Sequence, residues 1–182
     1  MANVFQLLTT LARLRAQRGE GGAARREVEW LHDAITAQGA LQRRQLTPGG
    51  ADFAAFLADM QSNWSRRIGA RPIVLAVEAQ PLRLSDQTST ALATIAQELV
   101  ANAIAHAFPG DRAGTISVRL ERLDAERAVL SVADDGVGYA PGEPDPTRLG
   151  LWLIGGLASQ VKGALTTTTD AGVAVRLEFP AG

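Results

Sequence analysis

The chain has 182 residues, of which 46% are hydrophobic and 20% are charged, a composition typical of a globular protein that is soluble in water. Its formal net charge is −1, so it lacks the basic field that would hold nucleic acid or an anionic membrane. The absence of cysteine excludes disulfides, cysteine nucleophiles and thiolate metal sites. No apolar run approaches the roughly 18 residues needed to cross a bilayer, and the N-terminus has no signal-peptide pattern. We therefore expect a cytoplasmic protein.

The N-terminal part, residues 1–48, has the pattern of a helical hairpin. Residues 2–18 carry one apolar stripe at helical spacing, formed by Val4, Leu7, Leu8, Leu11 and Leu14. Glycines interrupt this pattern, and a second helix over residues 23–46 places Val28, Leu31 and Ile35 on one face. A lone hairpin cannot bury both stripes, so we expect two copies to pair as a four-helix bundle, which makes the protein a homodimer.

The remainder, residues 51–182, reads as a second domain that begins after the Thr47–Gly50 break. Its expected elements are a helix over 52–68, a strand within 71–78, a helix over 85–107 capped by Ser85, strands over 115–121 and 128–133, a loop over 134–147, a helix over 150–161, and strands over 164–169 and 172–179. This order predicts an α+β fold. We expect an α/β sandwich in which a mixed, mostly antiparallel sheet has its helices on one face.

Three polar residues of the long helix, Glu98, Asn102 and His106, are spaced by four and therefore form one row. The core stripe of the same helix lies beside this row and consists of Leu92, Ile95, Ala96, Leu99 and Ala103. A row at the rim of a buried layer is accessible to a ligand. Asn supplies a neutral oxygen that suits Mg²⁺, and Glu can orient a water or polarise a nucleophile. The alternative is an ordinary solvated helix face.

The segment Asp134-Asp135-Gly136-Val137-Gly138 follows directly after an expected strand. A carboxylate at a strand end can accept a hydrogen bond from the exocyclic amine of adenine, and adjacent glycines let the backbone approach the ring closely. Because Asp-Gly is also a strong turn signal, a plain turn is the alternative.

A glycine-rich sequence, Arg148 to Leu157, opens the next helix. Helix N-termini present free N–H groups to phosphate, although a glycine-tolerant packing helix would have the same composition. No G-x-x-x-x-G-K-[ST] pattern is present, which excludes a Walker-type nucleotide site.

The order and spacing of these three segments resemble the GHKL ATPases, as found in histidine kinases. Residues 98–108 resemble their N box, residues 134–138 their D-x-G-x-G box, and residues 149–154 their second glycine box, so the resemblance covers about residues 52–182. It implies that the domain binds ATP with Mg²⁺. The implied roles are acid/base catalysis for Glu98, Mg²⁺ binding for Asn102, adenine recognition for Asp134, space for the nucleotide at Gly136, Gly138 and Gly150, and further nucleotide contacts at His106 and Leu151.

The N-terminal hairpin resembles that of the HWE-like kinases, whose acceptor motif reads H-R-x-x-N-x-x-Q-x-L. Asn3, Gln6 and Leu8 match the end of this motif, and the implied phosphoacceptor histidine falls two residues before Met1. We therefore expect this chain to lack it. His32 lies in a Leu-His-Asp sequence similar to the acceptor of another branch, but the stretch to Glu98 is too short for the second long helix of that branch. We expect a helix-surface histidine there.

The resemblance implies the core of a sensor histidine kinase in a two-component system. Such a kinase moves the ATP γ-phosphate to histidine and then to an Asp of a response-regulator receiver domain. Two positions depart from the family pattern: Ala105 stands where Lys or Arg is frequent, and Arg148 replaces the first glycine of the second glycine box. These departures favour one alternative, a degenerate, non-catalytic phosphotransfer or adaptor protein that docks a response regulator. A second alternative is an anti-sigma-factor serine kinase, but such proteins need no helical hairpin.

Overall fold

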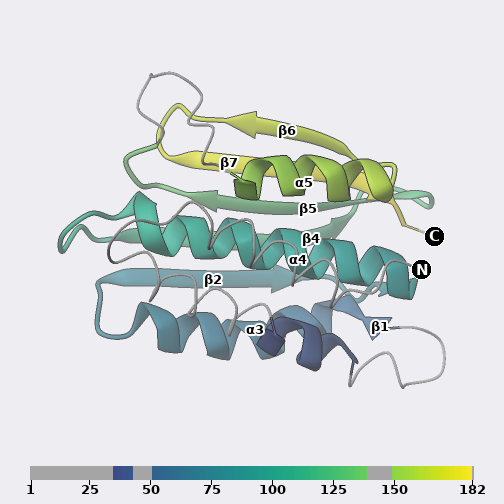
Figure 1. Ribbon diagram of the computed structural model, residues 1–182, viewed down its shortest axis with the longest axis horizontal. Helices are drawn as coiled ribbons and strands as arrows, with labels where there is room; N and C mark the ends of the chain where they lie inside the picture. The colour runs from purple at the N-terminus through teal and green to yellow at the C-terminus, as the bar shows by residue number, and fades with distance from the viewer. Residues whose placement is uncertain (1–34, 43–50, 139–148, 182) are drawn as a thin grey trace.

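The structure, a computed structural model, describes residues 35–42, 51–138 and 149–181 (Figure 1). In chain order the elements are β1 (Ala51–Asp52), α3 (Phe53–Ile68), β2 (Ile73–Ala79), β3 (Arg83–Leu84), α4 (Asp86–Asn102), the π-helical turn η1 (Ala103–Ala107), β4 (Gly114–Arg122), β5 (Arg127–Asp134), α5 (Leu149–Gln160), β6 (Ala164–Thr168) and β7 (Val173–Pro180). Residues 35–42 are helical as well. Every helix and strand expected after residue 51 is present.

Five strands form one sheet in the order β2-β4-β5-β7-β6. Strand β2 runs parallel to β4, and all other neighbours are antiparallel. This confirms the mixed, mostly antiparallel sheet. The sequence did not predict the pairing of β1 with β3, because two residues are too few to show any periodicity.

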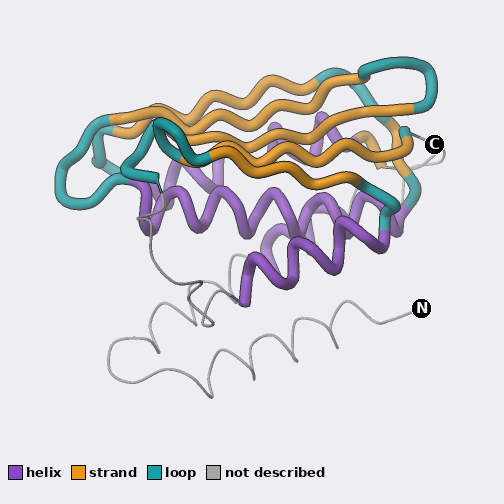
Figure 2. The backbone as a smooth tube through the Cα atoms, turned by 90° about the horizontal axis from the view of Figure 1, so that it is seen from above, coloured by secondary structure: helices purple, strands orange, loops and turns teal. Residues whose placement is uncertain are grey.

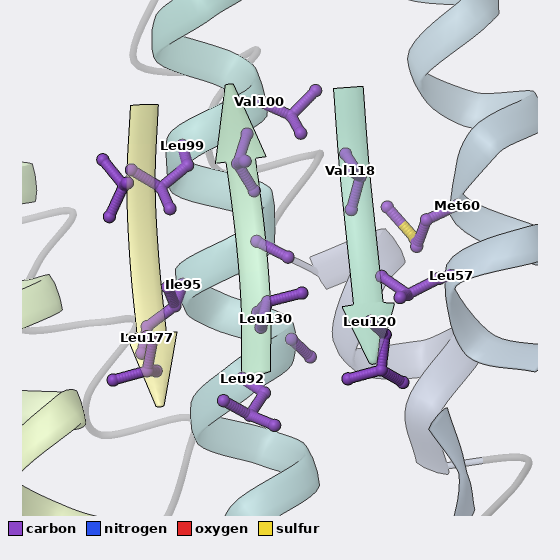
Figure 3. Packing of buried hydrophobic residues seen from close by; sticks show 14 of the residues in the cluster. Leu57, Met60, Leu92, Ile95, Leu99, Val100, Val118, Leu120, Leu130 and Leu177 are labelled. Atoms are coloured by element: carbon purple, nitrogen blue, oxygen red, sulfur yellow. The ribbon is translucent and has the colours of Figure 1, made fainter. Parts of the chain in front are cut away.

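The helices lie on one face of the sheet (Figure 2). Strand β4 shows the reason, because Ile116, Val118 and Leu120 are buried while Arg119 between them and Glu121 after them are exposed. In Figure 3 the side chains of Val118 and Leu120 meet Leu57 and Met60 of α3, and Leu130 lies opposite the leucines of α4. The fold is therefore the two-layer α/β sandwich expected from the sequence.

Two helices begin directly after residues whose side chains cap them. Asp52 Oδ1 accepts hydrogen bonds from Ala54 N at 3.1 Å and Ala55 N at 3.4 Å at the start of α3. Ser85 Oγ accepts from Thr88 N at 3.2 Å at the start of α4, as its position in the sequence predicts. Within the described part of the chain, no helix has the length and apolar character needed to cross a membrane.

The described helical residues 35–42 pack on the sheet domain. Ala37, Ala40 and Leu41 are buried in the same hydrophobic cluster as α3, whereas Ile35 is 51% exposed. The other residues of the expected apolar stripes, in helix 2–18 and at Val28 and Leu31, lie outside the described residues. The hairpin dimer and the boundary near residue 48 stay predictions.

Candidate functional site

Helix α4 carries the first two residues of the predicted polar row. The predicted core stripe, from Leu92 to Ala103, is buried. Glu98 is only 2% exposed and Asn102 is half-buried. An ordinary solvated face is therefore ruled out at Glu98. The two side chains stand one α-helical turn apart, beside the core and next to the end of the helix.

Beyond Asn102 the helix widens into the π-helical turn η1. Such turns are rare and often occur at functional sites. Because η1 has more residues per turn than an α-helix, the step from Asn102 to His106 is not the α-helical step that the sequence pattern assumed. Ala105 and His106 are both exposed on η1. The predicted row holds for Glu98 and Asn102, and the alignment of His106 with them stays a prediction.

Asp134 is the last residue of β5 and is half-buried. Its Oδ1 accepts hydrogen bonds from Gly136 N at 3.0 Å and from Val173 N, on the neighbouring strand β7, at 3.4 Å. The described residues provide no hydrogen bond to its other oxygen, Oδ2. Burial raises the pKa of Asp134, the two amide hydrogen bonds oppose this rise, and the nearby Asp135 adds to it. The result is a fixed carboxylate with one oxygen available to a donor.

The loop after Asp134 docks on the end of η1 through its backbone. Val137 N donates to Ala107 O at 2.9 Å. A Cβ placed on Gly136 would lie 2.4 Å from Ala107 O and 2.5 Å from Ala107 Cβ, so only glycine fits. This contact joins the two segments that the sequence singled out separately, Glu98–Phe108 and Asp134–Gly138, into one site.

Two glycines with positive φ lie in this loop and next to it. Gly138 has φ 69° and faces the carbonyl of Gly172, whose own φ is 99°. A Cβ on Gly172 would lie 1.9 Å from Asp134 O. The sequence placed Gly172 only at the start of an expected strand, 172–179. Nothing in the sequence relates this glycine to the backbone of Asp134, because the contact depends on the pairing of β7 with β5.

The second aspartate, Asp135, has a structural part in the site. Its Oδ1 accepts from Thr115 N, at the start of β4, at 2.7 Å, and its carbonyl accepts from Arg112 Nη2 at 3.2 Å. These bonds tie the loop to the neighbouring strand. Sequence reasoning assigned no role to Asp135, although its exposed position next to Asp134 is consistent with an anchoring side chain.

The end of α4 with η1, the end of β5 and the β6–β7 turn gather at one end of the sheet, and α5 runs alongside α4 on the same face (Figure 1). Gly150 and Leu151 lie in the first turn of α5, as expected for residues at a phosphate-binding helix start. Residues 139–147 of the expected loop and Arg148 lie outside the described residues, as do the side chains at 149–152.

This combination, a mixed sheet with helices on one face and a carboxylate-glycine loop docked on the end of α4, is the arrangement expected from the resemblance to the GHKL ATPases. Residues 65–179 match the family described as Histidine kinase-like ATPase domain. The match spans more than half of the chain, and the chain therefore belongs to this family. A search of curated protein sequences gives no match.

Solved structures of histidine kinases share the fold. The histidine kinase domain of the Erythrobacter litoralis EL346 blue-light activated histidine kinase superposes with a TM-score of 0.80 at 19% identity, covering 100% of this chain and 89% of that one. The longer structure of that kinase gives 0.73 at 22% identity, and the match spans 84% of this chain and 54% of that one. The Acinetobacter baumannii histidine kinase AdeS gives 0.60 at 16% identity, with 100% and 99% covered. At these identities the likeness establishes the fold alone.

Two glycine-to-alanine variants test the docking contact. Gly136→Ala places a methyl group against Ala107, so we expect a loss of about 1–3 kcal/mol in the free energy of unfolding and weaker nucleotide binding, because the loop must move. Gly156→Ala is the matched control: a Cβ there meets open space within α5, and replacing a helix-interior glycine should stabilise the protein by about 0.5–1 kcal/mol. Urea denaturation and ATP titration measure both effects. Equal behaviour of the two variants would contradict the docked loop.

Proposed function

We propose that this chain binds ATP with magnesium at the end of α4 and is the catalytic core of a sensor histidine kinase. The observation that carries the proposal is the environment of Asp134. One of its oxygens is held by two backbone amides, its other oxygen has no hydrogen bond from the described residues, and the loop beside it is packed on the end of α4.

The residues present suit an adenine ring. The exocyclic amine of adenine is a hydrogen-bond donor, and a half-buried carboxylate oxygen is a strong acceptor for it. Gly136 and Gly138 bring backbone rather than side chains to this position. We infer that Asp134 reads the base while the two glycines leave room for it.

The phosphate end of the nucleotide would extend toward Asn102 and the start of α5. The described residues contain no group of three or more His, Asp or Glu side chains placed to hold a metal. Magnesium would accordingly be held by the Asn102 amide oxygen together with the phosphates, in the way usual for nucleotide sites, and would neutralise charge on the triphosphate. Gly150 and Leu151, in the first turn of α5, would contribute backbone N–H groups. His106, exposed on η1, remains a predicted contact.

In the proposed reaction a histidine ring nitrogen forms a bond to the γ-phosphorus of ATP as the bond from that phosphorus to the ADP oxygen breaks. The proton of the attacking ring would pass to Glu98, whose buried carboxylate stands one turn from Asn102. The phosphoryl group would then pass to an Asp carboxylate of a response-regulator receiver domain. The acceptor histidine in this proposal is neither His32 nor His106.

One observation favours a second candidate, a protein that binds nucleotide and docks a response regulator without transferring phosphate. Ala105 is exposed on η1, at the position where the resemblance leads one to expect Lys or Arg. A cation there would contact phosphate, and alanine supplies none.

Replacing Asp134 by asparagine tests base recognition. We expect Asp134→Asn to weaken ATP binding several-fold or more, because the amide replaces one acceptor oxygen by a donor. The effect should depend on pH with a definite sign. Since the pKa of Asp134 is raised, its carboxylate takes up a proton at a higher pH than an ordinary Asp does. The ratio of the parent's ATP affinity to the variant's should therefore shrink as the pH falls through the raised pKa. Calorimetry at a series of pH values from neutral downward measures the ratio, in which titration of the ATP phosphates cancels. Equal affinities at neutral pH would remove Asp134 from the site.

Transfer is tested by completing the acceptor motif that Asn3, Gln6 and Leu8 match. The 182-residue chain should gain no acid-labile label from γ-labelled ATP. The chain extended by His-Arg immediately before Met1 completes the acceptor motif with Asn3 and Gln6, and it should become labelled. An extension by Gln-Arg is the matched control. ATP binding without labelling of the extended chain would select the non-catalytic candidate. Labelling of the original chain that disappears in His32→Ala would instead make His32 the acceptor.

A further inference from the structure

The end of the α4–η1 helix is held by a residue, Arg71, that lies outside the three motif segments of the sequence, 98–108, 134–138 and 149–154. The last carbonyls of a helix have no partner within the helix and need donors from elsewhere. Here the carbonyls of Ile104 and Phe108 accept hydrogen bonds from the Arg71 guanidinium, from Nη1 at 2.6 Å and from Nη2 at 2.7 Å. The two bonds use separate nitrogens of one planar group.

Arg71 is itself fixed by the sheet. It lies in the turn between α3 and β2, where its carbonyl accepts from Ile73 N at 2.8 Å and the carbonyl of Pro72 accepts from Gly114 N at 3.1 Å. Its side chain is half-buried, and no ion pair with a described residue competes for its charge. A cation at a helix C-terminus also interacts favourably with the helix dipole. The guanidinium therefore connects the end of η1 to the start of the edge strand β2 and fixes one relative to the other.

The same turn receives the Asp134–Gly138 loop. Ala107 O, which lies between the two carbonyls held by Arg71, accepts from Val137 N, and Gly136 packs against Ala107. Phe108, whose carbonyl Arg71 holds, also packs against Gly114 and is buried. Arg71 and the loop thus contact one turn of backbone from two sides without a hydrogen bond to each other.

We propose that Arg71 is a positioning residue for the nucleotide site. It fixes the carbonyls of η1 so that Ala107 O meets Val137 N, and in this way it holds the Asp134–Gly138 loop where the base binds. The inference rests on the proposed function for its ligand. The position of the loop, however, can be measured without any nucleotide.

The test compares the parent with Arg71→Gln, which removes the charge and one arm of the fork. Arg119→Gln is the matched control, because Arg119 lies on the open face of the sheet and its ion pair with Glu78 is exposed. Amide hydrogen exchange is measured in nucleotide-free protein at Val137, with Val118 and Leu130 in the central strands as references. ATP affinity is then measured by calorimetry in all three proteins.

We expect Arg71→Gln to accelerate exchange at Val137 by about tenfold and to weaken ATP binding by about tenfold, the effect of losing one charge-assisted hydrogen bond. Exchange at Val118 and Leu130 should stay unchanged, and Arg119→Gln should match the parent throughout. If Arg71→Gln does not fold, Arg71→Lys, which keeps the charge on one nitrogen, should show the same pattern more weakly.

Unchanged exchange at Val137 would overturn the proposal, and so would acceleration of equal size at all three amides, because Arg71 would then only stabilise the whole fold. Faster exchange at Val137 with unaltered ATP affinity would also overturn it. If the parent itself binds no ATP, the proposed function fails, and exchange at Val137 still decides whether Arg71 positions the loop.

Discussion

The site depends on one contact, the packing of the Gly136 backbone on Ala107 at the end of the α4–η1 helix. The hydrogen bond from Val137 N to Ala107 O orients the loop on the helix end. The close approach is possible because Gly136 has no side chain. Without it, the carboxylate at the end of β5 and the polar residues of α4 would belong to two unrelated surfaces. Helix α4 is in turn tied to α3 by a buried hydrogen bond of 2.8 Å from Trp64 Nε1 to Gln97 Oε1.

The environment of Asp134 has a cost to the fold. Its pKa is raised by burial, so the folded protein binds the proton of this carboxyl more tightly than the unfolded chain does. The contribution of Asp134 to stability is therefore present at low pH and is lost as the pH rises through the raised pKa. A half-buried carboxylate that is held by two backbone amides although its charged form is disfavoured is typical of functional groups and supports the proposed role in base recognition.

The order of the main helices and strands was predictable because each of them follows from a pattern of residues that are close together in the sequence. Apolar periodicity and the capping residue Ser85 predicted α4. The sequence could not predict contacts that form only after distant strands pair. The approach of Gly172 to Asp134 needs β7 beside β5, and the bonds from Arg71 to η1 join segments more than thirty residues apart. The π-helical turn leaves no periodic pattern either, because its five residues are too few to show one.

Binding of adenine nucleotide against the docked loop at the end of α4 can be measured by amide NMR of the labelled protein. On titration with Mg-ADP, we expect chemical-shift changes concentrated at Gly136, Val137 and Gly138 and at Asn102, with little change in the outer strand β6. Changes with Mg-GDP, which lacks the adenine amine, should be much smaller. Absence of change at these amides, or equal changes with both nucleotides, would contradict the proposed binding.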